Sequence, residues 1–226
     1  MTPAQFVQAL SQMEFDNVFN PYSKHCEVHD LENAPYLRSE ALCGVLGRAS
    51  SVDVDSLWIG RDLGYRGGRR TGLALTDDIH AHVHAMRWNV KIERATRGQP
   101  VAERTAAVIW GVLELIAVPV FLWNVFPLHP HEPGDPFTNR SHNSTERQAG
   151  EELLSELIHL LNPRKLVALG NDAAKTASAL AGKREVVTVR HPSHGGQGLF
   201  VRQMHSLYGI QRPMSQGAIK QSALSL

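Results

Sequence analysis

Four short runs rich in apolar residues, separated by stretches of helical character, constrain the fold of this chain most strongly. The runs are residues 56–60, 120–125, 165–170 and 185–189. Apolar runs that alternate with helices are typical of parallel strands, which are buried on both faces. The pattern therefore predicts an α/β fold with three layers, α/β/α, around a central four-stranded parallel sheet.

The clearest predicted helix begins after Asn143, because Glu146 stands three residues on and the two form a capping-box pattern. Apolar residues then recur at helical spacing until residues 162–163, where Asn-Pro ends the helix. A second helix is expected soon after, capped by Asn171 or Asp172.

The length and composition favour one globular domain. The chain has 226 residues, of which 42% are hydrophobic and 20% charged, and this is enough to bury a core without disulfides or metals. We expect a single domain over residues 1–210 and a loose polar tail over 211–226. The net charge of +1 means that any contact with a polyanion must come from a local patch.

The cysteine count and the apolar segments exclude several classes of protein. Cys26 and Cys43 alone provide neither a disulfide framework nor the four thiolates of an iron–sulfur cluster. Residues 1–20 carry acids and no long apolar run, unlike a signal peptide. Residues 106–126 are apolar, but they are better explained by a helix followed by a strand than by a membrane span. We expect a cytoplasmic protein.

Three polar residues stand at or just beyond predicted strand ends. Asp62 follows the first run, Asn124 lies near the end of the second, and His191 follows the fourth. Open α/β sheets bind ligands at the carboxyl ends of their strands, so these side chains are candidates for one pocket. Each has an ordinary alternative as a cap or turn residue, and the evidence lies in their combination.

A glycine- and arginine-rich segment surrounds the first of these residues. After Asp62 come four glycines and three arginines before residue 75. Glycine lets the backbone approach a ligand closely, and arginine indicates a polyanionic ligand. The candidate basic patch consists of Arg61, Arg66, Arg69 and Arg70.

Together these motifs resemble the uracil-DNA glycosylase superfamily. Gly60-Arg61-Asp62 and Gly72-Leu73-Ala74-Leu75 fall at the same internal spacing as the Gly-Gln-Asp and Gly-Leu-Ala-Phe elements of one branch. Trp123-Asn124-Val125 resembles the central strand that ends in a base-reading asparagine, and His191-Pro192-Ser193 resembles the late motif. The resemblance covers about residues 56–209 and suggests a divergent bacterial-type member without iron–sulfur cysteines.

The resemblance implies roles for individual residues. Asp62 would be the catalytic carboxylate, and His191 would stabilise the departing base. The implied substrate-binding residues are Gly60, Arg61, Leu63, Gly64, Tyr65, Leu75 and Asn124. The implied DNA-binding residues are Arg66, Arg69, Arg70, Gly72, Ser193, His194 and Gln197.

The sequence departs from the family pattern at places that bear on specificity. Gly64 stands where the uracil-specific branch has a tyrosine that blocks a 5-methyl group, which suggests a wider pocket. Leu75 replaces the aromatic residue that stacks on the base, and Tyr65 is a candidate substitute. The loop after His194 lacks the usual spacing of the intercalating leucine, and Gln197 or Leu199 is expected to fill the gap in the duplex.

The twelve histidines raise the question of a metal site. His80 and His84 share a predicted helix face near Asp77 and Asp78, but we favour a solvated helix face with no metal. Three more histidines, in the Pro-rich segment 127–143, are interpreted as part of the DNA-facing surface: His129, His131 and His142.

The function that the resemblance implies is DNA repair by base excision. A monofunctional enzyme without cofactor or metal would hydrolyse the N-glycosidic bond of flipped-out uracil in DNA and leave an abasic site. Two alternatives remain open: a broader glycosylase for mismatches or for xanthine, hypoxanthine and 5-substituted uracils, and a non-catalytic binder of damaged or abasic DNA. We expect DNA as the partner, no membrane association and a monomer.

Overall fold

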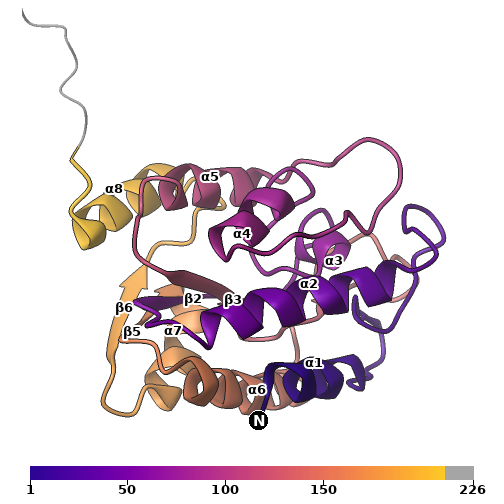
Figure 1. Cartoon of the computed structure of the whole chain (residues 1–226), viewed down its shortest axis with the longest axis horizontal. Coiled ribbons are helices and arrows are strands. Elements are labelled where there is room, and N and C mark those ends of the chain that lie inside the picture. The colour runs from indigo at the N-terminus through magenta and orange to yellow at the C-terminus, as the bar shows by residue number, and fades with distance from the viewer. Residues whose placement is uncertain (212–226) are drawn as a thin grey trace, which may run out of the picture.

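A four-stranded parallel sheet forms the middle layer of the protein (Figure 1). The structure is a computed structural model and describes residues 1–211. The strands lie in the order β3-β2-β5-β6, with bounds Val120–Asn124, Ser56–Gly60, Lys165–Leu169 and Glu185–Val189. The predicted fold is confirmed, with β3 and β5 each one residue shorter than expected.

Successive residues of a strand face opposite sides of the sheet, and the two sides are covered by different helices. Leu57 and Ile59 of β2 belong to a core cluster that includes residues of α1 (Pro3–Ser11), α2 (Ala34–Ala49), α6 (Ser144–Leu161) and α7 (Asn171–Leu180). Trp58, between them, packs in a second cluster with α5 (Arg104–Leu113) and α8 (Gln197–Tyr208). In Figure 1, α5 and α8 accordingly lie above the sheet, with α1 and α6 below it.

The helix caps match the prediction at α6 and differ at α7. Asn143 caps α6 and exchanges side-chain hydrogen bonds with Glu146, as expected. At α7 the cap residue is Gly170, with a φ of 93° and no side-chain capping bond. The prediction of Asn171 or Asp172 as the cap was wrong, because the Asp172 carboxylate pairs with Arg147 instead.

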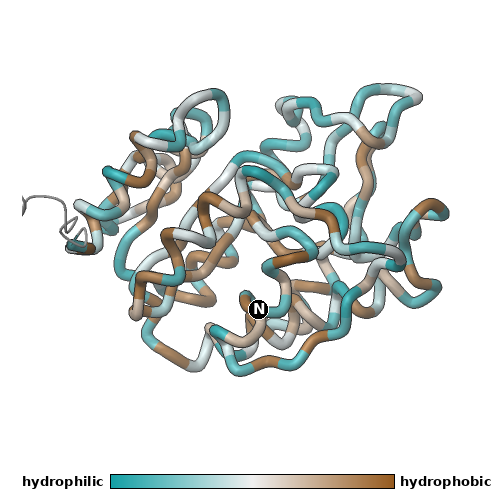
Figure 2. Tube along the Cα trace, turned by 90° about the horizontal axis from the view of Figure 1, so that it is seen from above, coloured by the Kyte–Doolittle hydropathy of each residue, from teal (hydrophilic) through white to brown (hydrophobic). Residues whose placement is uncertain are grey.

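The remaining elements extend from this framework. Two short helices, α3 (Gly68–Thr71) and α4 (Ala81–Arg87), follow β2, and β1 (Val18–Phe19) pairs antiparallel with β4 (His129–Pro130). Hydrophobic and hydrophilic residues alternate along the helices in Figure 2, as in helices with one face packed against a core.

The structure describes the apolar segment that was considered as a membrane span, but it does not describe most of the predicted tail. Residues 106–126 form parts of α5 and β3. Within residues 1–211, no helix is long and apolar enough to cross a membrane. The predicted tail, 211–226, lies outside the described residues apart from Gln211.

Candidate active site

The carboxyl ends of the strands open into a cavity of about 730 Å³, and both predicted catalytic residues line it. Asp62 lies two residues beyond the end of β2, and His191 lies two residues beyond the end of β6. Strands in a sheet lie roughly 4.8 Å apart, and one strand, β5, separates β2 from β6. The two side chains therefore approach the cavity from places roughly 10 Å apart along the sheet edge.

Both carboxylate oxygens of Asp62 have partners. His142 Nδ1 lies 2.5 Å from Oδ1, and Arg61 Nε donates to Oδ2 over 2.7 Å. An ionised carboxylate only accepts hydrogen bonds, so the His142 ring donates. The side chain of Arg61 is 48% exposed while that of Asp62 is 7% exposed, so the arginine contact is open to solvent and the histidine contact is not.

A second carboxylate lies near the other ring nitrogen of His142, without a hydrogen bond to it. Its Nε2 lies 3.6 Å from Oδ2 of Asp172, and its side chain is buried. The Arg147 guanidinium holds the other oxygen of Asp172. The interpretation of His142 as part of a DNA-facing surface was therefore wrong. Its position directly before the α6 cap was the signal that could have found it, since that cap fixes the start of a helix beside the sheet edge.

His191 is a neutral imidazole with a defined tautomer. Burial, followed by the charges of Arg61, Arg190 and His194, lowers its pKa to about 4. The backbone N–H of Ser193 donates to Nδ1 over 3.2 Å, and the Ser193 hydroxyl lies 2.7 Å from the same nitrogen. Because Nδ1 accepts, the ring proton is on Nε2, and His191 is a neutral hydrogen-bond donor.

Asn124 is buried at the end of β3, directly opposite Gly60 in the sheet register. A Cβ atom on Gly60 would collide with the Asn124 amide oxygen, so glycine is needed there for steric reasons. Neither the oxygen nor the nitrogen of this amide has a hydrogen-bond partner among residues 1–211. A buried unpaired amide is costly, and such exceptions are candidates for ligand binding.

Leu75 separates the paired ends of β2 and β3, at Gly60 and Asn124, from part of the cavity. Its side chain lines the cavity, and its Cδ2 would lie 2.8 Å from a Cβ atom on Gly60. Its φ is 56°, a left-handed conformation that is strained for a branched side chain.

Half of the predicted site residues line the cavity. They are Arg61, Asp62, Leu63, Gly64, Leu75, His191, Ser193 and His194. The other eight do not, namely Gly60, Tyr65, Arg66, Arg69, Arg70, Gly72, Asn124 and Gln197. Leu199, the alternative to Gln197, lines the cavity and is 43% exposed.

Arg69 and Arg70 are not on a DNA-facing surface, which corrects the sequence interpretation. Both are buried on α3. Arg70 forms an ion pair with the buried carboxylate of Asp78, and Arg69 stacks over the rings of Phe19 and Phe137. Their charges are used inside the fold, while Arg61 and Arg66 are exposed.

Gly72, for which a DNA contact is predicted, also has a structural role. It ends α3 with a φ of 69°, and a Cβ atom there would lie 2.8 Å from Cβ of Arg38. The buried hydroxyl of Tyr22 donates to its carbonyl oxygen over 2.7 Å.

Two other histidines, His84 and His129, are buried, contrary to expectation, and His80 is half-buried. The rings of His80 and His84 both pack on Trp110, and burial lowers the pKa of His84 to about 3. His129, interpreted as DNA-facing, is buried near Thr138, whose carbonyl lies 2.8 Å from its Nε2. Within residues 1–211, no group of three or more metal-ligating side chains comes together.

Sequence reasoning missed two acidic residues of the cavity wall, Asp172, considered only as a helix cap, and Glu103, which immediately precedes α5. Glu103 stands in a segment without a recognisable motif, so no local signal could have found it. Tyr65, the expected neighbour of Gly64 in the pocket, does not line the cavity.

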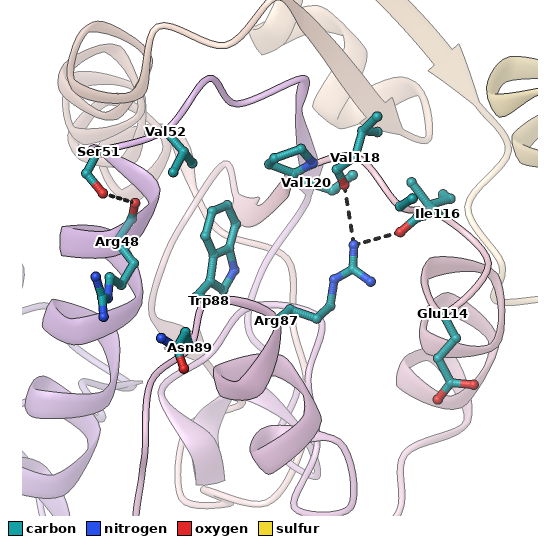
Figure 3. Close-up of a pocket in the computed structure, with 12 residues that line it drawn as sticks. Arg48, Ser51, Val52, Arg87, Trp88, Asn89, Glu114, Ile116, Val118 and Val120 are labelled. Carbon is teal, nitrogen blue, oxygen red and sulfur yellow. Dashed lines mark hydrogen bonds between the residues drawn. The ribbon is translucent and has the colours of Figure 1, made fainter.

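A second cavity, of about 550 Å³, lies beside the amino end of β3 (Figure 3). Arg87 points between the backbone carbonyls of Ile116 and Val118 and donates to both, and also to that of Leu113. This arginine therefore connects α4 with the end of α5 and the segment that follows it. None of the predicted site residues lines this cavity.

Comparison with known proteins agrees with this arrangement. Residues 51–199 match the family model of the uracil DNA glycosylase superfamily, which is more than half of the chain. The fold is similar to the crystal structure of wild-type SMUG2 from Pedobacter heparinus, with a TM-score of 0.58, 13% sequence identity and coverage of 92% of this chain and 97% of that one. A search of curated proteins gives no match. The chain therefore belongs to the uracil DNA glycosylase superfamily, a family of DNA glycosylases.

Proposed function

We propose that the protein hydrolyses the N-glycosidic bond of uracil in DNA and leaves an abasic site. One observation carries the proposal: a buried, anchored carboxylate and a neutral imidazole donor line the same cavity at the sheet edge. These are the two groups that cleavage of a glycosidic bond requires.

Cleavage leaves positive charge on the deoxyribose and negative charge on the departing base. Asp62 would stabilise the first charge and orient water toward the sugar carbon. His191 would donate its Nε2 proton as a hydrogen bond to a base carbonyl and so stabilise the second. Preorganised groups of this kind contribute most when the site excludes water, and each is worth on the order of 100-fold in rate.

His142 supports the proposal because it fixes Asp62 from the protein side. Its ring occupies one carboxylate oxygen and is itself placed between Asp62 and Asp172. The other oxygen faces Arg61, a solvent-open contact of the kind that contributes about 1 kcal/mol or less. This oxygen is the one that water or the sugar would reach when Arg61 turns toward a DNA phosphate.

Asn124 is the proposed reader of the base. Its amide offers one donor and one acceptor, which match O4 and N3–H of uracil, whereas cytosine reverses both groups. The unpaired state of both amide atoms supports this role, and Leu75, packed against the same side of Gly60, would have to yield for the base to reach it.

The base must leave the DNA helix to enter such a cavity. Three exposed arginines close to the cavity are the proposed phosphate contacts, namely Arg61, Arg66 and Arg190. Leu199, exposed on α8 and lining the cavity, is the candidate to fill the gap that the base leaves in the duplex.

A second candidate function, a broader glycosylase for xanthine, hypoxanthine or 5-substituted uracils, is favoured by Gly64, which places no side chain in the cavity wall. One experiment separates the candidates. The protein is incubated with oligonucleotides carrying uracil, thymine, hypoxanthine, xanthine or 5-substituted uracils, and abasic sites are revealed with alkali. Cleavage at uracil supports the proposal, preference for a purine supports the second candidate, and binding without cleavage of any substrate indicates a non-catalytic DNA binder.

A further inference from the structure

The cavity wall beside Gly64 is formed by a carboxyl group. A Cβ atom on Gly64 would lie 3.2 Å from Oε1 of Glu103, and a Cβ atom on Gly67 would collide with Oε2. The absence of side chains at these two loop positions is therefore what makes room for the carboxyl. The glycines do not simply widen the pocket, because Glu103 occupies part of the space.

Glu103 is held in place through its backbone. Its N–H donates to Oδ2 of Asp77 over 2.6 Å, and the other oxygen of this buried carboxylate accepts from His80. Although Glu103 is the cap residue of α5, its side chain makes no capping hydrogen bond. The backbone of Glu103 is thus fixed, while its carboxyl group is free to contact a ligand.

The surroundings make this carboxyl costly to bury without a polar partner. Burial and the nearby Asp77 carboxylate raise the pKa of Glu103, and Arg66 acts in the opposite direction. We find no hydrogen bond from the carboxyl to any group of residues 1–211. An apolar group pressed against it would remove its remaining water and give nothing in return.

The sheet order sets where this wall lies relative to His191. His191 approaches from the loop after β6, and Gly64 and Glu103 lie near the loop after β2, two positions away in the sheet. In a pyrimidine, the carbonyl at C2 and the C5–C6 edge lie on opposite sides of the glycosidic nitrogen. If His191 meets the carbonyl at C2, the C5–C6 edge faces Glu103.

We propose that Glu103 is a specificity-determining residue that excludes 5-methylated pyrimidines from the base pocket. The inference rests on the proposed function and adds the residue by which the enzyme discriminates uracil from thymine. The exclusion has a steric part, because the carboxyl fills the space beside Gly64, and a polar part, because a methyl group cannot replace the water on that carboxyl.

The test compares paired substrates in Glu103→Gln and Glu103→Ala. Single-turnover rates are measured on matched duplexes carrying uracil or thymine, and the rate ratio is the readout. Glu103→Ala should raise the thymine-to-uracil ratio by at least about tenfold, and the isosteric Glu103→Gln should raise it less. Gly67→Ala should act in the same direction, because the added methyl displaces the carboxyl. Glu114→Gln, at the opposite end of α5, is the matched control and should keep the wild-type ratio.

A second readout does not depend on catalysis. Affinities are measured for duplexes carrying 2′-fluoro-deoxyuridine or its 5-methyl analogue, both of which resist cleavage. The proposal is supported if the wild type binds the 2′-fluoro-deoxyuridine duplex more tightly than the 5-methyl duplex and Glu103→Ala loses this preference. This result would support the role of Glu103 even if the protein releases no base, which would contradict the proposed hydrolysis. The role of Glu103 would be overturned if the protein cleaves uracil but the thymine-to-uracil ratio is the same in wild type, Glu103→Ala and Glu114→Gln. It would also be overturned if the wild type shows no preference for uracil over the 5-methyl base in either assay.

Discussion

The neutral state of His191 predicts an unusual pH dependence. Its pKa is about 4, compared with about 6.5 for an unperturbed histidine. Protonation would place a second donor on Nδ1, where the Ser193 N–H already donates, and would turn the ring out of position. At pH 5.5 a group with a pKa of about 4 is still about 97% neutral, whereas one with a pKa of about 6.5 is only about 9% neutral. Activity should therefore survive at pH 5.5.

The assay is the apparent second-order rate for uracil release at limiting enzyme, from pH 4.5 to 8, because this quantity reports groups of the free enzyme. Since the folded-state pKa is lowered, the stability linked to His191 is present above about pH 6.5 and is lost as the pH falls toward about 4. Circular dichroism at each pH separates this effect from catalysis. The variant His191→Gln, which keeps a neutral donor, identifies any acid limb due to other groups. A roughly tenfold loss of rate between pH 7.5 and 5.5 in the folded wild type, absent from His191→Gln, would refute the reasoning.

Three further predictions concern charge, recognition and cofactors. Arg70→Ala leaves the Asp78 carboxylate without its ion-pair partner and should lower the free energy of unfolding by about 3–5 kcal/mol, whereas Arg66→Ala should weaken DNA binding and leave stability within about 0.5 kcal/mol in denaturant titrations. Equal stability of the two variants would contradict the structural role of Arg70. Asn124→Asp should reduce uracil excision in the oligonucleotide assay, since the amide donor is lost, and an unchanged rate and substrate profile would mean that Asn124 does not face the base. Activity should survive EDTA and give no borohydride-trapped adduct; loss of activity restored by zinc, or a trapped Schiff base, would contradict the proposed mechanism.

The sheet was predictable because its signals are local. Each strand is a short apolar run, and the capping box of Asn143 and Glu146 lies within four residues. Asp62 and His191 follow strand ends, so the topology of a parallel sheet was enough to bring them to one edge.

The rest of the site depends on contacts between distant segments. His142 meets Asp62 across 80 positions, and Glu103 reaches Gly64 and Gly67 from a segment without a motif. A cluster of arginines indicates a basic surface only when the side chains are exposed, and the burial of Arg69 depends on Phe19 and Phe137, which are distant in sequence. Local patterns thus placed the catalytic candidates but not the residues that hold them or shape the pocket.

The central claim, that the anchored Asp62 carboxylate drives base release, is tested most directly by single-turnover kinetics of Asp62→Ala on uracil-containing DNA. The account predicts a loss of at least about 100-fold in rate relative to wild type. Affinity for a duplex with an abasic-site analogue should change far less, which shows that the variant is folded and still binds DNA. A variant that releases uracil at a near-wild-type rate would contradict the account and place the catalytic carboxylate elsewhere.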